Sequence, residues 1–202
     1  KVKRLVYASS SSVYGNSDEM PFKETANVDE PISLYAATKK SNELMAHTYS
    51  HLYKIETIGL RFFTVYGPWG RPDMAIFLFT DAIINNKPIK VFNNGNLSRD
   101  FTYIQDITNG LVNTIIKDSK DDRLYKLYNI GNGKPVQLLD FIKSLEKALD
   151  ISSIKKRLPM QAGDVHQTFA NTSALERDYN YNPEITVEKG IQEFVLWYKS
   201  FY

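Results

Sequence analysis

The chain has 202 residues, a length that fits one large domain or one and a half domains of ordinary size. Hydrophobic residues make up 43% of it and charged residues 24%, so the chain can bury a sizeable core, and intrinsic disorder is excluded. The formal net charge of +2 argues against a nucleic-acid-binding protein, which needs a concentrated basic face. The absence of cysteine excludes a disulfide scaffold, a thiolate metal site and a cysteine nucleophile.

The hydrophobic pattern predicts an α/β architecture in which strands and helices alternate along the chain. The chain opens on a short apolar run at residues 5–8, which ends in a cluster of serines and is typical of a buried strand in a parallel sheet. Ser33 is suited to cap a helix that ends near Tyr53. Further strands are predicted at 56–60, 89–92, 99–104, 125–130 and 154–158, a tight turn at 93–96, and further helices at 75–85, 105–117, 136–149, 172–179 and 187–202.

The amino end indicates part of a longer protein, because residue 1 is a lysine and the chain opens directly in a predicted core strand. The apolar run there is shorter than the ~7–15 residues at the core of a secretion signal. Apolar runs elsewhere stay below the ~18 residues of a membrane helix. We therefore expect neither a secretion signal nor a membrane partner.

Tyr35 and Lys39 stand four residues apart on the predicted helix of residues 33–53, so their side chains emerge on one face. An ammonium beside a phenol stabilises the phenolate, which can take a proton from an alcohol and later return it. The pair alone is a weak signal, because about one Tyr-x-x-x-Lys is expected by chance in a chain with 13 tyrosines. An exposed surface pair is the alternative interpretation.

A run of serines, Ser9 to Ser12, follows the first predicted strand directly. Ligands of open parallel sheets bind at the carboxyl ends of the strands. A serine at that edge can hydrogen-bond the same hydroxyl that a phenolate deprotonates. A flexible linker is the alternative, although the run is held between a core strand and an aromatic turn.

Two arginine-containing segments supply candidate ligands for anions. Arg71 lies in a loop of glycines, prolines and aromatic residues, and its guanidinium can bind a carboxylate through two parallel hydrogen bonds. Arg99, in the motif Arg-Asp-Phe-Thr-Tyr-Ile, is suited to a phosphate. An aromatic core turn for the first segment and a surface salt bridge for the second remain open. No metal site is expected, because no carboxylate or cysteine cluster accompanies His47, His51 or His166.

Taken in order, four motifs resemble those of the extended short-chain dehydrogenase/reductases. They are the serine run, the Tyr-x-x-x-Lys pair, Arg-Phe-Phe-Thr-Val-Tyr-Gly-Pro at 61–68 and Arg-Asp-Phe-Thr-Tyr-Ile at 99–104. The chain is most similar to nucleotide-sugar epimerases, and among these to bacterial UDP-glucuronate 4-epimerases. The resemblance implies the carboxyl-terminal part of a Rossmann-type parallel sheet in residues 1–68, to which segments near 89–130 partly return. A smaller α/β substrate-binding domain is implied in residues 69–202.

The resemblance also implies residue roles. Tyr35 would act as catalytic base and acid, Lys39 would bind the nicotinamide ribose of NAD, and Ser10 would hydrogen-bond the 4-hydroxyl of the sugar. Phe63 would lie near the nicotinamide. The substrate's other groups would be held by Ser11, Ser12, Thr64 and Arg71 at the uronic carboxylate, Arg99 at the diphosphate and Asp164 at the nucleotide ribose or diphosphate.

The implied activity is NAD-dependent epimerisation at C4 of a UDP-sugar, from UDP-glucuronate to UDP-galacturonate through a 4-keto sugar. The implied protein is a cytoplasmic homodimer that pairs through the helix at 33–53. Epimerases of UDP-galactose or UDP-N-acetylglucosamine remain alternatives, and so does a nucleotide-sugar binding module without catalysis. A 4,6-dehydratase is disfavoured, because Ser11 and Ser12 stand where dehydratases carry an acid pair.

Two departures from the family pattern matter. The family begins with a strand and a Gly-x-x-Gly-x-x-Gly turn that seats the pyrophosphate on a helix end, and the ten glycines of this chain supply no such turn. We therefore expect this chain to be inactive by itself. Gln161 stands where galactose epimerases have a phosphate-binding arginine, which favours the uronate subgroup.

Overall fold

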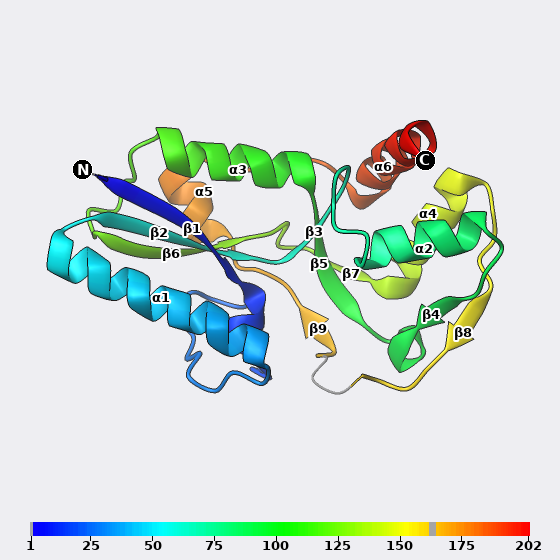
Figure 1. The fold of residues 1–202 in the computed structure, drawn as a ribbon, viewed down its shortest axis with the longest axis horizontal. Coiled ribbons are helices and arrows are strands. Elements are labelled where there is room, and N and C mark those ends of the chain that lie inside the picture. Colours follow the sequence, from blue (N-terminus) through cyan, green and yellow to red (C-terminus); the bar gives the residue numbers. More distant parts are fainter. Residues whose placement is uncertain (1, 162–164) are drawn as a thin grey trace.

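The computed structural model describes residues 2–161 and 165–202, in which strands and helices alternate along the chain (Figure 1). The first sheet is parallel and has the strand order β1-β2-β6. Its strands are β1 (Arg4–Ser10), β2 (Glu56–Phe62) and β6 (Tyr125–Ile130). The predicted α/β architecture with a parallel sheet is confirmed.

Helices lie on both faces of this sheet. α1 (Leu34–Tyr53) covers one face, and α3 (Ile104–Ile116) and α5 (Ser173–Tyr179) lie on the other (Figure 1). α1 begins where the sequence predicts, because the Ser33 hydroxyl accepts a hydrogen bond from the Ala36 amide at 3.1 Å. Between the sheet and α3 and α5, Ile58, Leu60 and Leu175 are fully buried.

A second group of elements lies beyond the carboxyl end of the sheet (Figure 1). Here β5 pairs in parallel with β3 and β9 and antiparallel with β7, and β4 pairs in parallel with β8. The strands and helices of this group are β3 (Thr64–Tyr66), α2 (Ala75–Ile84), β4 (Ile89–Val91), β5 (Ser98–Tyr103), β7 (Pro135–Gln137), α4 (Leu138–Leu149), β8 (Lys155–Arg157), β9 (Gln167–Thr168) and α6 (Val187–Phe201). Their core is rich in aromatic rings, with Phe101 stacked on Phe141 at 4.0 Å between centroids.

The structure differs from the elements predicted from the sequence only in short segments. β3 and β9 are too short to show a strand period, and β7 occupies the start of the helix predicted at 136–149. That helix begins later, at Leu138, because the preceding residues pair with β5. The turn predicted at 93–96 is a 3₁₀ turn, Phe92–Gly95, with Asn93 and Asn94 in the left-handed region.

The chain turns sharply after β3. Gly67 has a φ of +147°, and a Cβ at this position would lie 2.4 Å from Cγ2 of Ile104, so a glycine is required by both conformation and space. Trp69 follows with a φ of 61°. This turn carries the chain from β3 into the loop that holds Arg71.

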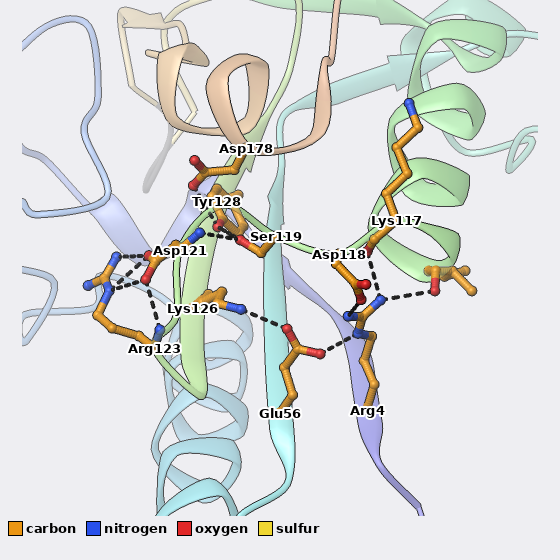
Figure 2. Close-up of polar contacts among 11 residues, drawn as sticks. Arg4, Glu56, Lys117, Asp118, Ser119, Asp121, Arg123, Lys126, Tyr128 and Asp178 are labelled. Atoms are coloured by element: carbon orange, nitrogen blue, oxygen red, sulfur yellow. Dashed lines mark hydrogen bonds and ion pairs between the residues drawn. The ribbon is translucent and has the colours of Figure 1, made fainter.

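A polar network lies at the amino ends of the parallel strands (Figure 2). Glu56 accepts a hydrogen bond from the Lys126 ammonium at 2.7 Å and pairs with the Arg4 guanidinium. Arg4 also donates to the Lys117 carbonyl at 2.8 Å and to Asp118 at 3.1 Å. The network ties the starts of the strands of this sheet to the loop after α3. Among the described residues, none of the helices combines the length and apolar character of a membrane span.

Candidate active site

The serine run forms a tight turn at the carboxyl end of β1. Ser10 ends the strand and caps a 3₁₀ turn, Ser11–Tyr14, because its hydroxyl accepts a hydrogen bond from the Ser12 amide at 3.2 Å. The Ser10 and Ser12 hydroxyls are also 3.1 Å apart. Ser10 is 7% exposed, so the turn is an ordered part of the structure. A flexible linker is therefore wrong for this run.

α1 brings Tyr35 and Lys39 to the same edge. Lys39 donates a hydrogen bond from Nζ to the carbonyl of Ala8, 3.0 Å away and two residues before Ser10. The Lys39 ammonium also lies 5.8 Å from the centre of the Tyr35 ring, which confirms that the two side chains share a face. Tyr35 is 52% exposed, so its phenol is open to a ligand. An accessible phenol beside an ammonium can exchange a proton with a bound hydroxyl.

A buried ion pair lies one turn further along α1. Arg61 donates from Nε and Nη2 to the two carboxylate oxygens of Glu43, each at 2.9 Å, and both residues are 1% exposed. Burial by itself lowers the pKa of Arg61, but the hydrogen bonds to Glu43 raise it above its ordinary value. Sequence analysis missed this pair, although Glu43 follows Lys39 at a helical spacing that places both on one face.

Asn129 fixes the far end of the serine turn. The Tyr14 hydroxyl donates to the Asn129 side-chain oxygen at 2.6 Å, and burial raises the pKa of Tyr14 to about 12. Asn129 Nδ2 in turn donates to the carbonyl of Phe22 at 2.8 Å. Tyr14 therefore acts as a neutral hydrogen-bond donor that anchors the turn on β6.

A pocket of about 220 Å³ lies beside the serine turn. It contains four of the residues expected to bind substrate, although they are far apart in the sequence. These are Ser11, Ser12, Thr64 and Arg99. Hydroxyls and a guanidinium on one pocket wall are donors suited to an anionic ligand.

β5 holds Arg99 beside this pocket. Arg99 Nη1 donates to the carbonyls of Ser98 at 2.9 Å and His166 at 3.3 Å. The adjacent Asp100 is fully buried, and its carboxylate accepts backbone hydrogen bonds from Asn132 at 2.7 Å, from Gly133 at 2.9 Å and from Ala170 at 3.0 Å. Burial raises the pKa of Asp100, while these hydrogen bonds act in the opposite direction. Asp100 thus joins β5 to two loops, a role that sequence analysis did not assign.

Arg71 and Phe63 lie at a second, more apolar pocket of about 280 Å³. Arg71 is exposed and forms two hydrogen bonds with Asp73, at 3.0 and 2.6 Å. The structure therefore does not bring Arg71 into the pocket that holds Ser11, Ser12 and Thr64. Asp164 lies outside the described residues.

Two of the three histidines contact neighbouring side chains. His47 packs edge-on against the ring of Tyr125, with 5.0 Å between centroids, and the His166 ring contacts the Asn93 amide at 3.3 Å. Within residues 2–161 and 165–202, acidic residues and histidines form no group that could hold a metal ion.

Comparison with known proteins relates this site to a family. The family model described as "NAD dependent epimerase/dehydratase family" matches residues 1–131. The chain is 49% identical to "Protein CapI" of Staphylococcus aureus, of which it covers 64% while all of the chain is matched. It is 47% identical to a "Probable UDP-glucuronate 4-epimerase" of Rhizobium meliloti, with 99% of the chain and 63% of that protein covered.

A solved structure is similar over the same extent. It is the UDP-glucuronic acid 4-epimerase of Bacillus cereus in complex with UDP-glucuronic acid and NAD, with a TM-score of 0.93 and 33% identity. The match covers 100% of this chain and 63% of that one. The chain thus spans less than two thirds of the length of the proteins it matches here.

Proposed function

This chain belongs to the NAD dependent epimerase/dehydratase family, and from that premise we propose that the whole protein interconverts UDP-glucuronate and UDP-galacturonate by epimerisation at C4, with NAD as cofactor. One observation carries the proposal. The serine turn and the Tyr35–Lys39 face of α1 meet at the end of β1, beside a pocket that contains Thr64 and Arg99. The choice of sugar is supported by the names of the Rhizobium and Bacillus relatives.

In the proposed reaction Tyr35, as phenolate, takes the proton of the sugar 4-hydroxyl while C4 is oxidised to the ketone. NAD, held by Tyr35 and Lys39, would supply the hydride acceptor and donor for C4, and rotation of the 4-keto sugar between the two transfers would present its opposite face. Tyr35 then returns the proton to O4, so the reaction is balanced. Lys39 stabilises the phenolate by its charge, and Ser10 holds the 4-hydroxyl through a hydrogen bond.

The residues present fit the nicotinamide end of NAD. Lys39 and the exposed phenol of Tyr35 offer polar groups to a ribose, and Phe63 lines an apolar pocket suited to a nicotinamide ring. The chain contains no Gly-x-x-Gly-x-x-Gly turn, so its residues account for this end of the cofactor only.

We assign the uronic carboxylate of the substrate to the pocket beside the serine turn. Ser11, Ser12 and Thr64 line that pocket together, and Arg99 lies at its wall for the diphosphate. The resemblance also assigns Arg71 to this carboxylate, although Arg71 lines the second pocket. Because Arg71 and Asp73 are both exposed, the guanidinium can leave Asp73, and it would have to move toward the first pocket to bind the carboxylate there. Asp164 is assigned to the nucleotide ribose or diphosphate by the resemblance alone.

A homodimer and a cytoplasmic location complete the proposal. α1 carries an exposed apolar surface that a second copy would cover, formed by Leu34, Leu44, Met45, Tyr49 and Leu52. The proposed division is into residues 1–68 and 69–202, with segments near 89–130 partly returning to the first domain, and the pairing of β6 with β2 supports that return. UDP-galacturonate made in this way would serve polysaccharide synthesis.

Turnover of UDP-glucuronate tests the proposal. The whole protein with NAD should yield UDP-galacturonate, detected by NMR of the anomeric protons. Turnover of UDP-galactose or UDP-N-acetylglucosamine in place of the uronate would reassign the sugar. Tight binding of UDP by calorimetry without turnover of any of these sugars would instead support a binding module.

Arg71→Ala tests the carboxylate assignment. The variant should lose at least about tenfold more kcat/KM for a UDP-uronate than for the corresponding neutral UDP-sugar, because only the uronate loses a charged hydrogen-bond partner. Asp73→Ala is the matched control, since it releases the same guanidinium without removing it. Equal losses for both sugars in Arg71→Ala would contradict the assignment.

A further inference from the structure

A single carboxylate joins α1, β1 and β2 at the carboxyl end of the sheet. Glu43, on α1, binds the Arg61 guanidinium of β2 through both oxygens at 2.9 Å. The same Oε1 atom accepts a hydrogen bond from the Ser9 hydroxyl of β1 at 2.6 Å. Ser9 and Arg61 are direct partners in the parallel register of β1 and β2. The side chains of two paired strand residues therefore converge on one carboxylate from the helix.

Stability is a weak reason for such a pair. Removing two charges from water is costly, and a buried ion pair is often no more stabilising than apolar side chains of the same volume. Glu43 and Arg61 are each 1% exposed, so they bear most of this cost. Since stability does not explain why this pair is buried, we examine what its geometry does.

The geometry fixes α1 against the end of β1. Lys39 donates to the carbonyl of Ala8, and Glu43, one helical turn later, accepts from Ser9, the next residue of the strand. Two polar contacts one turn apart, about 6 Å along the axis, prevent the helix from both sliding and rotating. Tyr35 lies one further turn toward the start of the same helix, on the face that Lys39 shares.

The pair also touches the serine turn. The Arg61 guanidinium lies 4.9 Å from the centre of the Tyr14 ring, which ends the 3₁₀ turn that Ser10 begins. Ser9, the third partner, is covalently joined to Ser10. The ion pair therefore contacts residues on both sides of Ser10 and lies on the helix that carries Tyr35, although it lines neither described pocket.

We propose that the Glu43–Arg61 pair, with Ser9, is a positioning device that sets the distance between the Tyr35 phenol and the Ser10 hydroxyl. The inference rests on the proposed function, since it concerns the placement of that reaction's proton-transfer groups. Both residues are positioning residues, because they act through Ser9, through Tyr14 and through α1, which carries Tyr35. A proton transfer requires hydrogen-bond distances, and a misplacement near 1 Å can cost about 100-fold in rate.

The test separates positioning from stability by comparing single and double variants of the whole protein. Glu43→Leu and Arg61→Met each leave a buried partner without its counter-charge, so each should lower both the free energy of unfolding and kcat. The double variant Glu43→Leu/Arg61→Met restores an uncharged interior. It should regain the unfolding free energy while kcat stays at least about tenfold below wild type and KM changes less than about twofold. Recovery of kcat together with stability would overturn the proposal.

Ser9→Ala provides a gentler variant if the others fail to fold. It removes one hydroxyl and leaves the ion pair intact, so the protein should fold normally with kcat reduced and KM unchanged. Wild-type kcat in a folded Ser9→Ala protein would overturn the part assigned to Ser9. The matched control is Glu56→Leu/Lys126→Met, which removes a charged pair at the amino ends of the strands of the same sheet and should leave kcat and KM as in wild type.

A crystal structure of the double variant tests the positioning role independently of the proposed reaction. We expect α1 to be shifted or rotated relative to β1, with a changed distance between Tyr35 Oη and Ser10 Oγ. An unchanged distance would overturn the positioning role, whatever the enzyme's substrate is. Absence of epimerase activity in the wild type would refute the proposed function, while this structural comparison would still decide the positioning role.

Discussion

The two ends of the β1-β2-β6 sheet carry similar charges in different surroundings. At the amino end, Arg4 pairs with Glu56, its register partner, and Glu56 also binds Lys126 (Figure 2). At the carboxyl end, Glu43 and Arg61 have side chains that are 2% exposed, whereas those of Arg4 and Glu56 are 22% and 19% exposed.

The difference lies in what each network touches. The amino-end network joins the strand starts to the end of α3 and the loop after it, because Arg4 also donates hydrogen bonds to the carbonyls of Ile115 and Lys117 and to Asp118. The carboxyl-end pair contacts Ser9 and the Tyr14 ring, beside the proposed reacting groups. Arginine–glutamate pairs can thus serve to fasten chain segments or to place functional groups, and their position on the sheet distinguishes the two uses.

The largest expected effect is at Tyr35, which has no counterpart at the amino end. Tyr35→Phe removes the proposed proton acceptor, and kcat for UDP-glucuronate should fall by about 100- to 10,000-fold. UDP affinity measured by calorimetry should stay near wild type, because the lost hydroxyl does not contact the nucleotide. A variant that retains more than about a tenth of wild-type kcat would contradict the role of Tyr35.

The second largest effect is the loss of unfolding free energy when the glutamate at each end of the sheet is replaced by leucine. Glu43→Leu leaves Arg61 buried without a counter-charge and should lower the free energy of unfolding by about 3–5 kcal/mol in urea titrations. Glu56→Leu removes a more exposed carboxylate but also leaves the buried Lys126 without its partner, and should cost less, about 2 kcal/mol. Equal losses would mean that burial does not distinguish the two clusters.

A smaller effect is expected when pH is lowered. Burial by itself raises the pKa of Glu56, but hydrogen bonds from Lys126 and Arg4 hold it below its usual value. Since the folded pKa is the lower one, this contribution to stability is complete above the unfolded value of about 4.3 and is lost as pH falls through the folded value. We would measure the free energy of unfolding of wild type and Glu56→Gln from about pH 3 to about pH 6. It should fall less steeply with decreasing pH in the variant. Identical slopes would show that Glu56 is not responsible.

The smallest effect is at the rim of the amino-end network. Arg123 binds Asp121, but the arginine side chain is 74% exposed. Arg123→Ala should therefore change the free energy of unfolding by less than about 0.5 kcal/mol, since exposed pairs are screened by water and salt. Thermal unfolding at low and high salt would detect a larger contribution.

Local sequence signals account for much of the fold. Ser33 predicts the start of α1, and the apolar runs predict the β1, β2 and β6 strands within about two residues, because caps and buried strands depend on neighbouring residues. The shared face of Tyr35 and Lys39 follows from the helical period and is confirmed. The start of α4 was misplaced because pairing with β5, a contact distant in sequence, extends residues 135–137.

The site was predicted less completely than the fold. Ser11, Ser12, Thr64 and Arg99 line one pocket. The resemblance instead grouped the first three with Arg71, which lies at the second pocket. The Glu43–Arg61 pair, in contrast, depends on how α1 rotates against the sheet, which a helical period alone does not specify. Arg71 pairs with Asp73 in an exposed loop, where an arginine has several possible partners, so sequence spacing does not predict this contact.

Asp100 has a consequence for how the molecule assembles. Its carboxylate accepts hydrogen bonds from the amides of Asn132 and Ala170, which are 32 and 70 residues away along the chain. Closing loops of this size costs chain entropy, and contacts distant in sequence slow folding. The neighbouring Arg99 wall of the pocket therefore acquires its final shape only after both distant segments have arrived, which makes the ligand edge a late product of folding.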